Sequence, residues 1–359
     1  MHVTVAICTW NRADLLDAAL TSLARAAIPA GVTWDVIVAN NNSTDHTEDV
    51  LDKHVGRLPL TRLFVSQQGK SYALNKVVER LAGDLVLWTD DDVLVAENWI
   101  TSYVDAAYRW PEAAFFGGHI IPRFLGEEPG WLRPAWPAIS GVYSARELGD
   151  EPFAFDRKRL PFGANMAARV ELQKRYRFDP ELGRRGELLL SGEETALMQR
   201  WLSDGHVGMW VPRSRVEHII TPDRLEPDHI RRFFFGLAES KRPRGKADWP
   251  LVRFFRGGWY ACRAMMYEAI IGFFPQATQP DRWIKCLKRL SYCWGRVESQ
   301  WGGFPSWLKP APVRRLKQGR GQPRIVIPVT VPLAVAAGDA AESSPAMPDA
   351  AMSPRKIAA

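Results

Sequence analysis

The chain has 359 residues, of which 46% are hydrophobic and 24% charged, so it is long and apolar enough for one large domain with an appendage. An aromatic content of 11% excludes a wholly disordered chain, and four scattered cysteines exclude a disulfide-built scaffold and favour a reducing compartment. The net charge of +7 is uneven: residues 1–227 carry −6, whereas residues 228–324 carry +14. Basic segments of this kind bind nucleic acid or anionic membrane surfaces.

Short apolar runs alternate with helical spacing from residue 1 to about residue 120. The expected strands are His2–Cys8, Trp34–Asn40, Leu60–Val65, Leu85–Thr89 and Phe115–Ile121, and the expected helices are Ala13–Ala27, Thr47–Val55 and Ser71–Leu81. Such alternation is typical of a mostly parallel sheet covered by helices on both faces. Ligands of such sheets bind at the carboxyl ends of the strands.

The stretch Pro122–Leu160 is rich in Pro, Gly and Trp and predicts a long loop. Its Trp131 and Trp136 either stack on a ligand or anchor the loop. Further strands are expected at Phe162–Arg169 and Val207–Val211, with a helix at Glu193–Ser203. The composition then predicts three parts: an α/β domain at 1–227, a basic, aromatic-rich helical extension at 228–319, and a disordered tail at 320–359.

Three consecutive aspartates, Asp90, Asp91 and Asp92, follow the apolar strand that ends near Thr89. Adjacent carboxylates repel one another unless a cation or solvent relieves them. Hard cations such as Mg²⁺ or Mn²⁺ take carboxylate oxygens and bridge them to substrate phosphates. A solvated acidic turn explains an isolated triplet equally well, but the position at a strand end favours a metal site.

Two other polar loops follow strands: Thr9–Arg12 after the first and Ala39–Asp45 after the second. Their amides and hydroxyls suit nucleotide recognition, although helix capping alone also explains the second loop. The sequence Gly69-Lys70-Ser71 is similar to the end of a phosphate-binding P-loop, but Phe64 stands where that motif needs glycine, which excludes it. A lysine at a helix start can still face phosphate.

Taken in order, these segments resemble family 2 glycosyltransferases of the GT-A fold, over about residues 1–220. The segments are VAICTWNR, ANNNSTD, QGKSYALN, LWTDDDV, PFGANMAARVELQKRYRFDPELG, GEET and VEH. The resemblance implies a Rossmann-like GT-A sandwich and an inverting transfer from a nucleotide-sugar, expected to be UDP-linked, to a saccharide or lipid-linked acceptor, assisted by Mg²⁺ or Mn²⁺.

The resemblance also assigns site residues. On the nucleotide-sugar side it places Thr9, Asn11, Arg12, Asn40, Asn41, Lys70, Asp90 and Asp91. The metal ligands it implies are Asp90, Asp92 and His218, and the acidic pair is Glu193-Glu194, with Glu194 in the place of the general base. There are two departures: Asn40 stands where the family usually has Asp, and Glu194 is one methylene longer than the usual Asp. Without the resemblance, the common preference for acidic residues in the first turn of a helix would explain the acidic pair.

The basic extension contains the apolar run Ala264–Phe274, which is shorter than the ~20 residues that span a bilayer. An amphipathic helix on an anionic membrane surface fits the Trp, Tyr, Lys and Arg around it, and an ordinary helical subdomain is the alternative. No signal peptide is recognisable after Met1, so we expect a cytoplasmic protein at the inner face of the cell membrane. Two other functions compete with this interpretation. One is a nucleic-acid-binding protein that uses the basic extension, but it leaves the aspartates unexplained, so we expect no nucleic acid as a partner. The other is a nucleotidyltransferase.

Overall fold

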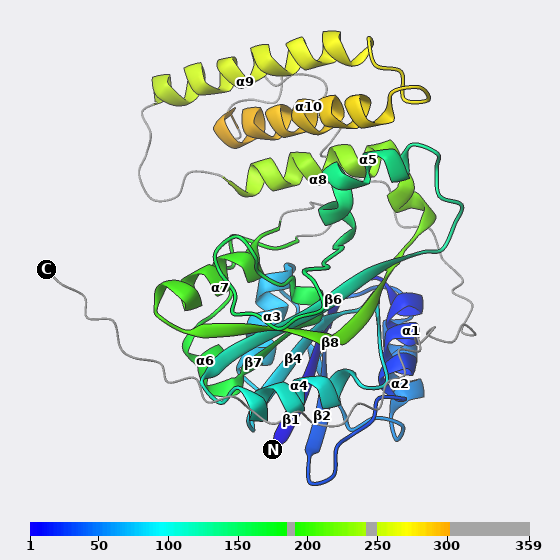
Figure 1. The fold of residues 1–359 in the computed structure, drawn as a ribbon, viewed down its shortest axis with the longest axis vertical. Coiled ribbons are helices and arrows are strands. Elements are labelled where there is room, and N and C mark those ends of the chain that lie inside the picture. The colour runs from blue at the N-terminus through cyan, green and yellow to red at the C-terminus, as the bar shows by residue number, and fades with distance from the viewer. Residues whose placement is uncertain (185–190, 242–249, 302–359) are drawn as a thin grey trace, which may run out of the picture. The chain divides into compact units, whose positions relative to one another are not determined.

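Four parallel strands form the first half of the sheet in the computed structural model, which describes residues 1–184, 191–241 and 250–301. They are β1 (His2–Thr9), β2 (Thr33–Asn40), β3 (Leu60–Phe64) and β4 (Leu85–Asp90), in the spatial order β3-β2-β1-β4 (Figure 1). Successive side chains enter two different cores: Val5 and Ile7 of β1 lie in one and Ala6 in the other. Burial on both faces accounts for the continuous apolar runs of these strands.

The sheet continues through β7 (Met166–Arg169), β6 (Ala113–Phe124), β8 (Val207–Ile220) and β5 (Val93–Val95). The strand β7 runs antiparallel to both of its neighbours, β4 and β6, and β5 runs antiparallel to β8. The pair β6 and β8 is parallel. The sheet is therefore mostly parallel, as predicted.

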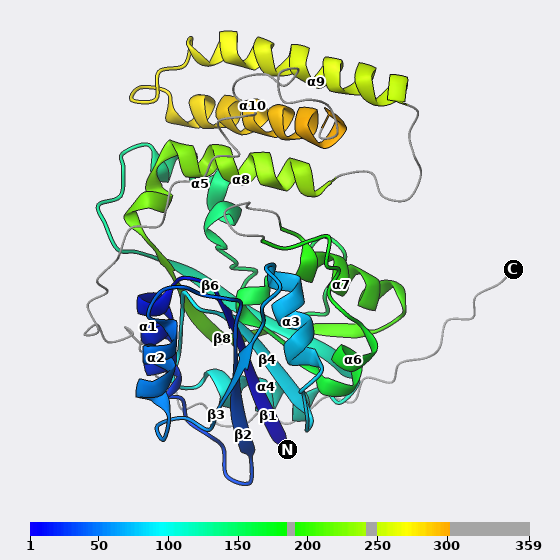
Figure 2. The ribbon, with the colours of Figure 1, turned by 180° about the vertical axis from the view of Figure 1, so that it is seen from behind.

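Helices cover both faces of the sheet. One core packs α1 (Ala13–Leu23), α2 (Thr47–His54) and α4 (Trp99–Arg109) against it, and the other packs α3 (Lys70–Val78), α6 (Val170–Arg175) and α7 (Glu193–Ser203). The helix α4 lies over the sheet in the view of Figure 1, and α3 lies over it in the view of Figure 2. The predicted α/β sandwich is confirmed.

The C-terminal extension is helical, as predicted. It consists of α8 (Pro227–Ser240), α9 (Pro250–Ile271) and α10 (Pro280–Trp301), with α10 between the other two (Figure 1). An apolar cluster joins α8 and α10 to α5 (Leu132–Ile139) and to the short 3-10 helix η1 (Ser140–Tyr143). Among the described residues, no helix is both long and apolar enough to cross a bilayer.

The predicted loop at Pro122–Leu160 is wrong in part, because β6 continues to Phe124 and the helices α5 and η1 follow. These helices form because Trp131, Leu132 and Ile139 bury their side chains against the C-terminal extension. The local sequence does not predict this contact. Trp131 packs edge-on against Trp283 of α10 and thus anchors this segment. Residues 302–319 of the predicted extension and the predicted tail 320–359 lie outside the described residues.

Candidate active site

Polar residues at the ends of three parallel strands meet at one edge of the sheet. In the strand register Thr9 pairs with Asn40, and Cys8, one residue before Thr9, pairs with Asp90. The loops after β1, β2 and β4 therefore lie together, as the strand order predicted, at the edge where parallel sheets bind ligands.

Each aspartate of the triplet has a cationic partner. The Nζ of Lys70 lies 3.1 Å from Oδ1 of Asp90, and Nη1 of Arg12 lies 3.0 Å from both Asp91 Oδ1 and Asp92 Oδ2. Asp91 and Asp92 are buried, whereas Asp90 is partly exposed. The repulsion expected among three adjacent carboxylates is thus relieved by side chains of this protein, and Asp90 is the most accessible of the three.

The partners shift the three carboxyl groups differently. Burial raises the pKa of Asp91 even though Arg12 stands beside it and Thr9 Oγ1 donates a hydrogen bond of 2.8 Å to it. At Asp90 burial acts in the same direction, but Lys70 outweighs it and lowers the pKa. The triplet is therefore not three equivalent ligands, because each carboxylate has its own electrostatic environment.

Asp92 forms the second half of the site with His218 and Arg224. Its Oδ2 lies 3.3 Å from His218 Nε2 and 3.1 Å from Arg224 Nη1. His218 Nδ1 donates a 2.8 Å hydrogen bond to the carbonyl of Tyr143, which orients the ring and directs Nε2 toward Asp92. Burial acts to raise the pKa of Asp92, but His218, Arg12 and Arg224 lower it well below its ordinary value.

Two of the three predicted metal ligands converge. A carboxylate oxygen of Asp92 and an imidazole nitrogen of His218 face the same point, and this donor pair fits Mn²⁺ or Mg²⁺. Asp90 points instead toward Lys70. Within residues 1–184, 191–241 and 250–301 no group of three or more His, Cys, Asp or Glu side chains is arranged to hold a metal ion. A cation here would take its remaining ligands from phosphate or water.

Arg224 stands at the point where this cation would bind. Its Nη1 lies 3.1 Å from Asp92 Oδ2 and 3.3 Å from His218 Nε2. Burial lowers the pKa of this guanidinium to about 10. Arg224 therefore competes with a metal ion for the same two acceptor atoms. The sequence analysis did not identify it, although it is a basic residue six positions beyond His218.

Lys70 joins the aspartate side of the site to the acidic pair at the start of α7. Its Nζ lies 2.8 Å from Glu194 Oε1, 3.5 Å from Glu193 Oε1 and 3.1 Å from Asp90 Oδ1. Burial acts to lower the pKa of Lys70, but the three carboxylates raise it well above its ordinary value. The predicted base and a predicted donor-binding aspartate therefore share one cation.

Glu193 and Glu194 lie in different environments although they are neighbours in sequence. Glu193 is buried, and its Oε2 has no hydrogen-bond partner among the described residues. Burial, followed by the charge of Glu194, raises the pKa of Glu193 to about 8. Glu193 thus keeps its proton at neutral pH, and Glu194 is the member of the pair that lies closer to Lys70.

Gly163 allows Glu194 to occupy its position. A Cβ atom added at Gly163 would lie 2.5 Å from Glu194 Oε1, far inside contact distance. Gly163 begins the short 3-10 helix η2 (Gly163–Asn165), which leads into β7. The sequence analysis did not assign this glycine a role, because the approach of α7 to η2 is a tertiary contact.

A buried amide holds η2 in place. Asn165 Oδ1 accepts hydrogen bonds from Trp99 Nε1, Tyr103 Oη and Ser214 Oγ at 2.8, 2.7 and 3.1 Å. Its Nδ2 donates to the carbonyls of His119 and Ser214 at 2.8 and 3.2 Å. Asn165 is fully buried, so these bonds lock the floor of the site in one conformation.

The predicted nucleotide-binding loops are braced by their own asparagines. Asn41 uses its whole amide on backbone groups: Nδ2 donates to the carbonyls of Val65 and Gln67, and Oδ1 accepts from the amide of Gly69 at 2.8 Å. Asn40 Nδ2 donates to Glu48, and Asn11 Oδ1 accepts the amide of Thr44 at 2.7 Å. These bonds position the backbone around the sheet edge.

Comparison with known proteins finds similarity to glycosyltransferases. Residues 4–160 match the family model described as "Glycosyl transferase family 2". The succinoglycan biosynthesis protein ExoM of Rhizobium meliloti is 27% identical over 135 residues, which cover 37% of this chain and 43% of ExoM. The chain thus spans less than half the length of that relative. The glucosyl-dolichyl phosphate glucuronosyltransferase of Haloferax volcanii is 24% identical over 249 residues, covering 67% of this chain and 77% of the relative.

Among solved structures, the mannosyltransferase PcManGT of Pyrobaculum calidifontis, in complex with GDP-Man and Mn²⁺, is similar to this chain. The comparison covers 88% of this chain and 77% of PcManGT, with 17% identity and a TM-score of 0.49.

Proposed function

Residues 4–160 of this chain match glycosyl transferase family 2, and from that match we propose that the chain transfers a sugar from a nucleotide-sugar to a saccharide or lipid-linked acceptor with inversion at the sugar carbon. The observation that carries the proposal is the meeting of Asp90, Glu193 and Glu194 around Lys70, at the edge of the sheet where the loops after β1, β2 and β4 lie. A donor site and a base are thereby brought within one cluster of side chains.

Glu194 acts as the general base in this proposal. Inversion requires a carboxylate that removes the proton of the acceptor hydroxyl as its oxygen attacks from the side opposite the leaving phosphate. Glu194 forms the 2.8 Å salt bridge with Lys70, whereas the raised pKa of Glu193 keeps that neighbour protonated. Gly163 and η2 hold Glu194 at a fixed position beside Lys70. Glu193 then serves as a neutral, buried support for the helix start.

The nucleotide diphosphate lies, in this proposal, along the sheet edge formed by the loops after β1, β2 and β4. Arg12 and Lys70 supply positive charge there, and Asp90 is the accessible carboxylate for a ribose hydroxyl or a cation-bound phosphate. We expect UDP as the nucleotide. Asn40 in place of the usual Asp alters the contact to the base, so the base preference is the part of the donor assignment that most needs direct measurement.

A divalent cation, Mg²⁺ or Mn²⁺, completes the proposal. Asp92 Oδ2 and His218 Nε2 would hold it, since they converge and their donor chemistry suits these ions. Bound there, such a cation would supply positive charge that offsets the charge of the leaving diphosphate. The residues of the chain do the rest: Tyr143 orients His218, Arg12 aligns Asp91 with Asp92, and Glu194 takes the proton. We place the enzyme in the cytoplasm, with its basic extension at the inner face of the membrane.

The proposal is tested by product analysis with the full-length protein. A panel of nucleotide-sugars is first screened by thermal shift with Mn²⁺, because a ligand that binds the native state raises its melting temperature. The stabilising donor is then incubated with saccharide and lipid-linked acceptors, with and without EDTA. We expect nucleoside diphosphate, an inverted glycosidic linkage, loss of turnover with EDTA, and no turnover by Asp92→Asn. Release of pyrophosphate would identify a nucleotidyltransferase and overturn the proposal.

A further inference from the structure

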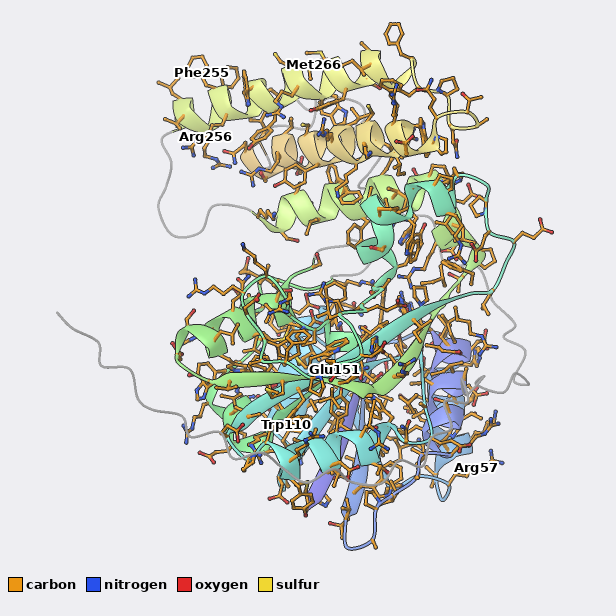
Figure 3. The ribbon with its side chains drawn as sticks, in the orientation of Figure 1. Arg57, Trp110, Glu151, Phe255, Arg256 and Met266 are labelled. Atoms are coloured by element: carbon orange, nitrogen blue, oxygen red, sulfur yellow. The ribbon has the colours of Figure 1, made fainter. Side chains whose placement is uncertain are left out.

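The outer face of α9 is apolar and exposed along its whole length. Phe255, Trp259 and Met266 expose 70%, 62% and 46% of their surface, and Phe273, just beyond the helix end, exposes 76%. Cys262 is exposed between them. The spacing of four, three and four residues from Phe255 to Met266 places these four residues on one side of the helix, and together with Phe273 they form what we call the α9 face. In Figure 3, Phe255 and Met266 project from the side of α9 away from α10.

The opposite side of α9 is fully used in packing. Ala264 and Tyr267 are buried with residues of α8 and α10 in one apolar cluster. A Cβ atom at Gly257 would lie 2.0 Å from the indole nitrogen of Trp301, so that glycine lets the two helices touch. Arg253 donates two hydrogen bonds, of 3.1 and 2.8 Å, to the carbonyl of Gln300. The orientation of α9 is thus determined by its inner side, which leaves the α9 face directed outward.

Positive charge flanks the α9 face on one side. Arg256 and Arg263 are seven residues apart, so they lie on the same flank. The guanidinium of Arg263 lies 5.9 Å from the ring centroid of Trp259. Next to it is an open pocket of about 460 Å³ lined by Phe255, Arg256, Trp259, Tyr260 and Arg296. Aromatic rings with guanidinium groups around them suit an anionic headgroup above acyl chains.

We infer that the α9 face docks on an anionic phospholipid bilayer, with Trp259 and Phe255 among the acyl chains and Arg256 and Arg263 at the level of the phosphates. The inference rests on the membrane placement proposed above and names the surface that makes the contact. An isolated exposed apolar residue needs no explanation, but a row of Phe255, Trp259, Cys262 and Met266 that runs for about 16 Å along one side of a helix does. The net charge of +14 in residues 228–324 matches the sign of such a bilayer.

The test is vesicle flotation with the full-length protein, on phosphatidylcholine vesicles with and without phosphatidylglycerol. We expect binding to the anionic vesicles that weakens with salt, and a loss of at least about tenfold in Phe255→Ser/Trp259→Ser. The matched control is Phe64→Ser/Tyr108→Ser, because these side chains are similarly exposed, at 62% and 64%, and lie outside the extension. The control pair must bind like the wild type, and all variants must keep the wild-type melting temperature.

The charged flank is tested with Arg256→Gln/Arg263→Gln, for which exposed Arg57→Gln is the control. We expect this double variant to lose the preference for anionic vesicles while Arg57→Gln keeps it. At equal ionic strength, inorganic phosphate should release no more wild-type protein from the vesicles than chloride does, since the bilayer and not free phosphate is the proposed ligand. Equal binding by wild type and both double variants would overturn the inference.

An environment-sensitive fluorophore on exposed Cys262 reports on the α9 face directly. We expect a blue shift on anionic vesicles and quenching by spin-labelled lipid, whereas the same label in Cys262→Ser/Tyr108→Cys stays in water. A label that is already shielded in the free protein would mean that a second copy or residues 302–359 cover the face, and would refute membrane docking. Because flotation and fluorescence need no sugar donor, their failure would leave the proposed transfer reaction standing.

Discussion

Replacing Glu193 by glutamine should make the protein more stable in alkaline solution. In the unfolded chain Glu193 loses its proton near its ordinary pKa of 4.5, whereas in the folded protein it keeps the proton up to about pH 8. Between these values unfolding releases a proton, so the carboxyl destabilises the fold increasingly as pH rises. Between about pH 5 and about pH 9, the difference between the two pKa values lowers the free energy of unfolding by about 4 kcal/mol. Glu193→Gln removes this loss because glutamine does not titrate.

The assay is the melting temperature of wild type and variant at a series of pH values. For a chain of this size about 4 kcal/mol corresponds to about 8 °C, so the variant should gain that much on the wild type between pH 5 and pH 9. Exposed Glu112→Gln is the control and should show no such gain. A difference between Glu193→Gln and wild type that does not change with pH would refute the protonated, buried carboxyl described here.

Comparing Glu193→Gln with Glu194→Gln distinguishes the proposed buried support, Glu193, from the proposed general base, Glu194. Glu193→Gln keeps the shape and the neutral charge of the protonated acid, so kcat at pH 7 should stay within about threefold of wild type. Glu194→Gln should lower kcat by about 10²–10⁴-fold with little change in donor affinity, as expected for loss of a general base. A silent Glu194→Gln with an inactive Glu193→Gln would reverse the assignment.

Three further substitutions test the surroundings of the site. Asn165→Ala leaves buried donors of Trp99 and Tyr103 without an acceptor and should cost about 4 kcal/mol, seen as a melting temperature about 8 °C lower. Gly163→Ala should push the Glu194 carboxylate aside and lower kcat by about 10²-fold while donor KM changes little; unchanged kinetics would show that the carboxylate has room to move. Arg224→Gln should tighten Mn²⁺ binding in calorimetry by about tenfold, because the competing guanidinium is gone, and equal or weaker binding would contradict that competition.

The parallel half of the sheet was predictable because its signals are local. Each of its strands is a continuous apolar run, and Asp90 and Asn40 each end one of them, so the strand order alone brings their loops together. The start of α7 at Glu193 was also predicted correctly. These features follow from periodicity and from the geometry of parallel sheets, which a single sequence contains.

The features that were missed depend on contacts between distant segments. Arg224 meets Asp92 across 132 positions of sequence, and nothing near either residue indicates the pairing. The helix α5 was predicted as loop because its Pro and Trp content is typical of loops, and only its burial against α10 stabilises it. The different environments of Glu193 and Glu194 likewise depend on burial and on contact with Lys70.

The C-terminal helices contact the candidate site through Tyr143. This residue belongs to the apolar cluster that α8 and α10 complete with Phe234 and Leu287, and its carbonyl aligns His218. A protein shortened before α8 would expose the side chains of α5 and η1 to water and free that carbonyl to turn. The extension is consequently not an independent module. A chimera that replaced it with another C-terminal segment would have to reproduce the surface that packs against Tyr143.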